Sequence, residues 1–136
     1  MHNINNKSNY TEEYHLNGKP NNIVELYNEL KKQILKIGEI IFIIPRQKYI
    51  AYKVSNNFKG TFVNITFQKS GIELNLCFGK DSYGNFKRKY QNNDMIKRWN
   101  DKYNYCVMYL KKNNELDKII PLIKECYEIR KRDLKK

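Results

Sequence analysis

Two strands joined by a tight turn are indicated by residues 61–78, TFVNITFQKSGIELNLCF. Apolar side chains occupy alternate positions on either side of the turn: Val63, Ile65, Phe67, Ile72, Leu74, Leu76 and Phe78. Such alternation of β-branched and aromatic residues is typical of strands in a half-buried sheet. Because Ser70-Gly71 suits a tight reversal, we predict antiparallel strands at 61–68 and 72–78.

The same pattern extends to three more segments of the chain. It predicts strands at 40–44, ending at Pro45, at 49–54 and at 103–110. The connections between the first four strands are shorter than the dozen or more residues of a parallel crossover. We therefore expect an antiparallel sheet of about five strands in a meander.

Two amphipathic helices flank these strands. The first carries apolar residues at steps of three and four: Ile23, Leu26, Tyr27, Leu30, Ile34 and Ile37. Asn21 and Asn22 offer an N-cap, and Gly38 ends the helix. The second helix begins near Asn113, and Pro121 should either kink it or delay its start until just before the proline. Helices packed together on one side of the sheet bury both stripes, which predicts a two-layer α+β sandwich.

The remaining segments lack a pattern that would bury them. Residues 1–10 are predicted to be a disordered tail, residues 11–129 a single α+β domain, and residues 130–136 a basic, solvated tail. Residues 79–93 are predicted to form an exposed loop, followed by a short helical turn at 95–99. The length of 136 residues is that of one ordinary domain.

The chain carries a large excess of positive charge. Lys and Arg number 26 against 14 Asp and Glu, for a net charge of +12. A surface of this kind concentrates polyanions such as nucleic acid. Only five of the cations are arginines, the residue favoured for bidentate contacts with phosphates and bases. An AT-rich genome also produces chains rich in Lys, Asn, Ile and Tyr, so composition alone does not separate the two explanations.

Neither a membrane anchor nor a disulfide framework is indicated by the sequence. No apolar run approaches the roughly 20 residues that cross a bilayer, and the first ten residues do not resemble an export signal. We therefore expect a cytoplasmic protein with no membrane partner. Cys77, Cys106 and Cys126 are odd in number and widely spaced, which predicts reduced and mostly buried thiols.

Four segments, taken in order, resemble a known family. They are YTEEYHL at 10–16, IVELYNEL at 23–30, YIAYK at 49–53 and QKSGIELNL at 68–76. Over roughly residues 10–129 the chain is similar to the domain of unknown function 5655. Members of that family are often labelled "predicted transport protein" and are commonly attached to the carboxyl side of predicted endonucleases. The resemblance implies a fold and an association with nucleases, and it implies no reaction.

The sequence shows no arrangement of histidines or carboxylates that is typical of a catalytic site. The family usually has Gly-His-Trp-Gly before the last strand, whereas this chain has KRWN at 97–100 and keeps only the Trp. The only histidines are His2 and His15, and we interpret His15 as a packing or capping residue. Restriction-type endonucleases use an Asp with a Glu-x-Lys pair, but Asn75 stands where a lysine should follow Glu73. We expect no enzymatic activity, no metal and no cofactor.

Aromatic residues interleave with cations between positions 83 and 103. Such mixtures follow a phosphate backbone while exposed rings stack on bases. The predicted nucleic-acid-binding residues are Lys87, Arg88, Lys89, Lys97, Arg98, Trp99 and Lys102, joined by Arg46 and Lys48 near Pro45. The alternative for Trp99 is that it anchors the segment to the core while the lysines face water. Tyr49 and Tyr52 lie on opposite faces of their strand, so either could be core or surface.

Three functions are open on this basis. The first is a non-enzymatic module that binds DNA or RNA as an accessory to a nuclease or a phage-defence system. The second is an adaptor or inhibitor that binds a nuclease or effector through the sheet face or an edge strand. The third is a small-molecule pocket between helices and sheet, lined by Tyr27, Tyr52 and Tyr127. The first depends on whether cations distant in the chain gather in the folded protein.

Overall fold

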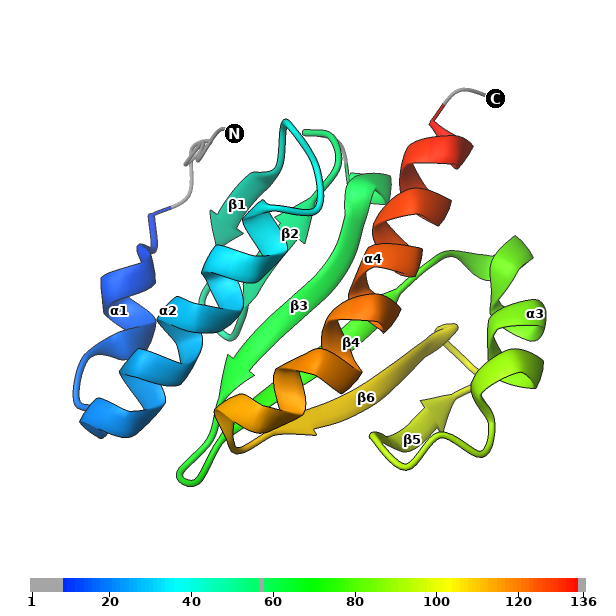
Figure 1. The fold of residues 1–136 in the computed structure, drawn as a ribbon. Coiled ribbons are helices and arrows are strands. Elements are labelled where there is room, and N and C mark those ends of the chain that lie inside the picture. The colour runs from blue at the N-terminus through cyan, green and yellow to red at the C-terminus, as the bar shows by residue number, and fades with distance from the viewer. Residues whose placement is uncertain (1–8, 57, 135–136) are drawn as a thin grey trace.

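The computed structural model describes residues 9–56 and 58–134, and it has helices on one face of a six-stranded antiparallel sheet (Figure 1). The strands are β1 (Phe42–Pro45), β2 (Ile50–Lys53), β3 (Thr61–Phe67), β4 (Ile72–Cys77), β5 (Ile96–Asn100) and β6 (Tyr105–Leu110). The helices are α1 (Glu12–Leu16), α2 (Asn21–Leu35), α3 (Lys80–Tyr90) and α4 (Leu116–Asp133), with 3-10 turns at Phe58–Gly60 and Asn113–Glu115. The strand order is β1-β2-β3-β4-β6-β5. The predicted α+β class is confirmed.

The β3–β4 hairpin forms where the alternation predicted it. Phe67 pairs with Ile72, and the amide of Gln68 donates to the carbonyl of Gly71 at 2.9 Å. A Cβ at Gly71 would lie 2.7 Å from the carbonyl oxygen of Leu110, so the turn packs against the end of β6 too closely for any side chain. The reversal therefore requires glycine at this position.

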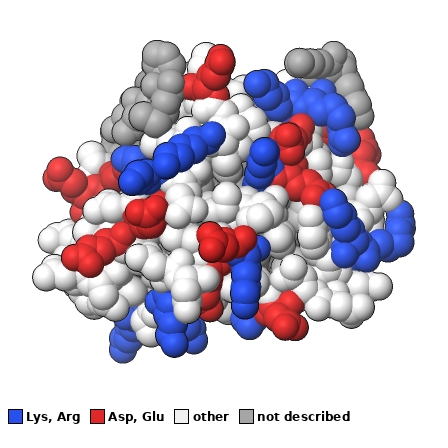
Figure 2. All heavy atoms as spheres, in the orientation of Figure 1, with Lys and Arg blue, Asp and Glu red and all other residues white. Residues whose placement is uncertain are grey.

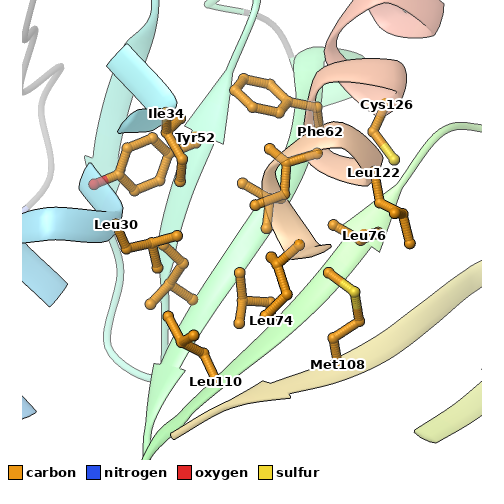
Figure 3. Packing of buried hydrophobic residues seen from close by; sticks show 14 of the residues in the cluster. Leu30, Ile34, Tyr52, Phe62, Leu74, Leu76, Met108, Leu110, Leu122 and Cys126 are labelled. Atoms are coloured by element: carbon orange, nitrogen blue, oxygen red, sulfur yellow. The ribbon is translucent and has the colours of Figure 1, made fainter. Parts of the chain in front are cut away.

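The core lies between the sheet and the two long helices, α2 and α4 (Figure 3). Leu30 and Ile34 of α2, and Leu122 and Cys126 of α4, point toward the side chains of Leu74, Leu76 and Met108 on the sheet. The stripe predicted for α2 is confirmed, since Ile23, Leu26, Tyr27, Leu30 and Ile34 are all buried. The predicted Asn cap is wrong, because Pro20 occupies the N-cap and no side chain caps the helix.

Residues 80–90, predicted to be part of an exposed loop, form helix α3. Tyr83, Phe86 and Tyr90 follow one another at steps of three and four, and this aromatic stripe faces the protein. The ring of Phe86 stacks on that of Phe78 with centroids 4.2 Å apart. The loop prediction was wrong because the stripe is aromatic and is interrupted by Gly84 and three cations, so it resembles an exposed segment.

Residues 96–100 form strand β5, where a short helical turn was predicted. β5 pairs only with β6 and is an edge of the sheet. The sheet is a meander through β4, but β6 then pairs with β4 and β5 lies outside it. Helix α3 connects β4 to the edge strand β5, and β5 and β6 then form a hairpin that places β6 between β4 and β5.

The carboxyl-terminal basic segment continues helix α4 as far as Asp133 and is not a separate solvated tail. Arg130 donates from Nε to the carbonyl of Thr61 at 2.7 Å, and Arg132 donates to the hydroxyl of Ser82 at 3.1 Å. α4 begins at Leu116, so Pro121 lies inside the helix and does not delay its start. Residues 1–8 of the predicted tail and residues 135–136 lie outside the described part of the chain.

Candidate functional site

The sheet has a second face, opposite α2 and α4, on which none of the α-helices in the described part of the chain packs (Figure 1). We call it the open face. The register places one row of residues across all six strands of this face: Ile44, Ala51, Asn64, Asn75, Val107 and Arg98. None of them belongs to the core cluster, whereas their neighbours Tyr52, Leu74 and Met108 do. With strands about 4.8 Å apart, the row is about 24 Å long.

At the β5–β6 end of the row, Arg98 lies between two tyrosines. Arg98 is opposite Val107 in register, and Tyr105 and Tyr109 flank Val107 on the same face of β6. Hydrogen bonding to the hydroxyls of Tyr105 and then Tyr109 raises the pKa of the Arg98 guanidinium. Val107 is 0% exposed, although no helix covers it. An exposed arginine and two half-buried rings therefore form one unit on the open face.

Beyond Ile44, at the opposite end of the row, Arg46 and Tyr49 lie in the β1–β2 turn, where the amide of Arg46 donates to the carbonyl of Tyr49 at 2.7 Å. Lys53 is on the same face of β2 as Ala51 and is only 5% exposed. Burial, and then the positive charge of Arg46, lowers the pKa of the Lys53 ammonium group. Arg46 follows β1 two residues after Ile44, so continued alternation places it on the open face. Tyr49, which precedes β2, is 37% exposed, whereas Tyr52 is in the core.

Two asparagines occupy the centre of the row. Asn64 of β3 and Asn75 of β4 are register partners, so their side chains are adjacent. Among residues 9–56 and 58–134, neither buried Oδ1 atom has a hydrogen-bond partner, and the Asn64 amide nitrogen has only a 4.0 Å contact to the sulfur of Cys77. Sequence reasoning missed both residues. Their signal was a polar residue in the middle of each strand, at positions facing away from the core.

The three predicted site residues on α3 differ in their partners. Lys87 forms an ion pair with Asp101 at 2.9 Å, and Lys89 forms one with Glu125, also at 2.9 Å. Arg88 donates to the side-chain oxygen of Asn85, which is neutral. Two of these three predicted site residues are therefore compensated by carboxylates within the domain.

The predicted residues on and after β5 divide between surface and core. Lys97 donates to the carbonyl of Asp94 at 3.1 Å, and the Lys102 ammonium lies 5.2 Å from the centroid of Tyr103, a residue that is 66% exposed. The Trp99 ring packs edge-on against two rings of α3, Tyr83 at 6.0 Å and Phe86 at 6.2 Å. Trp99 thus anchors α3 to β5.

The cations do not gather into one continuous patch. Arg46 and Lys48 lie beside β1 and β2, at the opposite edge of the sheet from β5, which carries Lys97 and Arg98. On the side that bears the helices, positive side chains are interspersed with negative ones (Figure 2). The structure nevertheless brings Arg46 and Arg98 to the two ends of the same open face.

A buried polar network supports the Arg46 end of the site. His15 donates from Nε2 to the carbonyl of Arg46 at 2.5 Å and thereby attaches α1 to the β1–β2 turn. Tyr27 donates to a carboxylate oxygen of Glu12 at 2.5 Å, and the hydroxyls of Tyr27 and Tyr52 are 2.7 Å apart. Burial is the largest cause of the raised pKa of both tyrosines, which keeps them neutral. These contacts join three of the segments that suggested the family.

The three tyrosines considered for a small-molecule pocket do not share one. Tyr27 and Tyr52 belong to the network beneath α2. Tyr127 packs edge-on against Phe62 at 5.3 Å, and its hydroxyl would lie 2.0 Å from a Cβ at Gly38. Tyr127 lines a surface cavity of about 350 Å³ that Tyr27 and Tyr52 do not reach.

The thiols are buried or half-buried and unpaired. Burial raises the pKa of Cys77 to about 11 and that of Cys106 to about 12, and Cys126 is also shifted upward. Within residues 9–56 and 58–134, no three His, Cys, Asp or Glu side chains are grouped so as to hold a metal ion. In the same ranges, no helix combines the length and the apolar character needed to span a membrane.

Comparison with known proteins gives one match. No similar curated protein and no similar solved structure was found. The family model described as "Domain of unknown function (DUF5655)" matches residues 12–130, which include α1, the whole sheet and most of α4. Because the match covers most of the 136 residues, the chain belongs to the DUF5655 family.

Proposed function

We propose that this protein is a non-enzymatic module that binds nucleic acid through the open face. The observation that carries the proposal is the placement of arginine and tyrosine at both ends of that face. The backbone amide of Arg46 donates to the carbonyl of Tyr49 across the β1–β2 turn, and Arg98 lies opposite Val107, which Tyr105 and Tyr109 flank. Guanidinium groups bind phosphates, and aromatic rings stack on bases, so each end offers both contacts.

The charges around the β5 end support the same proposal. Among the described residues, the four salt bridges involve neither Arg88, Lys97, Arg98 nor Lys102. Their positive charge is not cancelled by a bonded carboxylate. Neutralising phosphates releases counterions, which stabilises complexes with nucleic acid at low salt.

We further propose that it acts as an accessory to a nuclease or a phage-defence system, because the family resemblance implies an association with predicted endonucleases. A binding module of this kind would hold DNA or RNA near an active site on another polypeptide. The protein itself would then supply affinity, and the partner would supply the chemistry.

A salt series tests the proposal. Binding of labelled DNA and RNA oligonucleotides is measured between about 50 and 200 mM salt for the unmodified protein and for an Arg46→Gln, Arg98→Gln variant. Log affinity falls as log salt rises, and for single strands the loss of two phosphate contacts should make this negative slope shallower by about 1.4. The matched control is Lys118→Gln, Lys124→Gln, which removes the same charge from exposed positions on α4. Absence of binding at low salt refutes the proposal, as does an equal effect of the control.

A second candidate, the protein-binding adaptor, is favoured by the edge strand β1. β1 pairs with β2 on one side only, and it lies beside a cavity of about 350 Å³ lined by Ile40, Phe42 and Val54. Ile40 is 48% exposed, which is unusual for a large apolar side chain. Pull-down from the native host, with and without nuclease digestion, separates the candidates. A partner retained after digestion and lost on Ile40→Glu supports the adaptor.

A further inference from the structure

The shape of the open face distinguishes between forms of nucleic acid. The major groove of a duplex admits an α-helix or a two-stranded ribbon, which are narrow and convex. The row on the open face crosses six strands and has small or medium-sized side chains at its centre, among them Ala51, Asn64, Asn75 and Val107. A sheet face of this width exceeds the two-stranded ribbon that the major groove admits, whereas unpaired bases can lie flat on it.

The aromatic residues of this face are placed for stacking. Tyr105 and Tyr109 flank Val107, the register partner of Arg98, so both rings lie beside one guanidinium, and the amide of Asn100 donates to the hydroxyl of Tyr105 at 3.2 Å. Tyr49 is exposed at the other end of the row. About 24 Å separates the two ends, a distance that calls for an extended strand with several nucleotides between the outer phosphates.

The central asparagines add a group that can recognise bases. Val107 and Ala51 are buried in the same row, so apolar side chains fit here and the amides are not needed for packing. The Oδ1 atoms of Asn64 and Asn75 have no hydrogen-bond partner in the part of the chain that the structure describes. The terminal torsion of asparagine is broad, so either amide can turn toward a ligand. Amides pair with the donor and acceptor atoms on base edges.

From these observations we infer that the open face binds a single strand of nucleic acid along the row from Arg46 to Arg98. Phosphates contact the two arginines, bases stack on Tyr49, Tyr105 and Tyr109, and the amides of Asn64 and Asn75 hydrogen-bond to base edges in the middle. The inference rests on the proposed function and narrows it to unpaired bases. It also assigns base preference to two residues outside the cationic groups.

Fluorescence anisotropy with short labelled oligonucleotides tests the inference. The probes are dT12, dA12, dC12 and rU12, together with a 12-base-pair duplex, at one fixed salt concentration. We expect at least one single strand to bind about 10-fold more tightly than the duplex, and the homopolymers to differ in affinity. If the duplex binds as tightly as every single strand, the inference fails while the proposed function stands. If no probe binds at low salt, both fail.

Replacement of the amides tests the part assigned to Asn64 and Asn75. The double variant Asn64→Val, Asn75→Val should melt no lower than the unmodified protein and keep its salt dependence, but lose the differences among homopolymers. The control Asn28→Leu removes an exposed amide from α2 and should leave those differences unchanged. Unaltered base preference in the folded double variant overturns the assignment. Competition between dT12 and the duplex for the unmodified protein tests strand preference without any substitution.

Discussion

Replacing Asn75 by valine should stabilise the protein. The buried Oδ1 atom of Asn75 has no hydrogen-bond partner, and an unsatisfied buried polar group costs about 1–3 kcal/mol. Valine suits the site because Val107, the next residue in the row, is fully buried, and because β-branched residues favour strands. We expect the free energy of unfolding to rise by about 1–2 kcal/mol and Tm by about 3–7 °C for a domain of this size.

Urea denaturation and thermal melting, both followed by circular dichroism, measure the change. The control is Thr66→Val, because Thr66 is on the same face but its hydroxyl donates to the carbonyl of Lys48 at 3.5 Å. That variant should gain no stability. If Asn75→Val unfolds at a lower urea concentration than the unmodified protein, the amide contributes to folding and the reasoning is refuted. Gained stability with lost base preference would show that the asparagines are kept for binding.

Three further changes test other parts of the structure. Phe86→Ala should lower the free energy of unfolding by about 3–5 kcal/mol in urea denaturation, since Phe86 stacks on Phe78; a loss below 1 kcal/mol would mean that α3 is not part of the core. Arg46→Gln should raise the pKa of Lys53 in an NMR titration, because the charge of Arg46 helps to lower it. The pKa of Lys53 is lower in the folded than in the unfolded protein, so the free energy of unfolding rises with pH between these two pKa values, and it should rise less steeply in this variant. An unchanged Lys53 pKa would mean that the Arg46 side chain is not close to Lys53. At pH 8 an aromatic disulfide reagent should label Cys77 and Cys106 only after unfolding, because their raised pKa values keep them protonated; rapid labelling of the native protein would contradict the raised pKa values.

Most of the fold could be predicted because its signals are local. The stripe of α2 and the alternation in β3 and β4 are complete within each segment, and both elements formed where expected. The short turn at Ser70-Gly71 then determined which strands pair. The spacing of apolar residues and the residue types of a turn are properties of a few consecutive residues, so these elements could be predicted without knowledge of distant contacts.

The errors lie where a segment is ordered by distant partners. The α3 stripe of Tyr83, Phe86 and Tyr90 becomes apolar in effect only when Phe78 and Trp99 complete an aromatic cluster. β5 has a register shift between Ile96 and Arg98, which breaks its alternation, and the strand depends on pairing with β6. Neither partner is adjacent in sequence, so the local pattern indicated a loop and a helical turn.

The candidate site could be predicted only in part. Arg46 and Arg98 were identified from their cationic neighbourhoods, but their common placement on the open face depends on the strand order and on which sheet face the helices leave uncovered. The roles of Asn64 and Asn75 depend on the register between β3 and β4. Trp99, in contrast, was considered as a stacking residue, and its contacts with α3 place it against the core cluster.

The open face as the binding surface is tested most directly by amide chemical-shift mapping. A ¹⁵N-labelled sample is titrated with dT12 at low salt, and shifts are followed along the β1–β2 turn, β3, β4, β5, β6 and the two long helices. We predict that the largest changes occur at Asn64, Asn75, Val107, Arg46 and Arg98, and that the exposed sides of α2 and α4 are unaffected. Shifts concentrated on α2 or α4, with the row unchanged, would contradict the account.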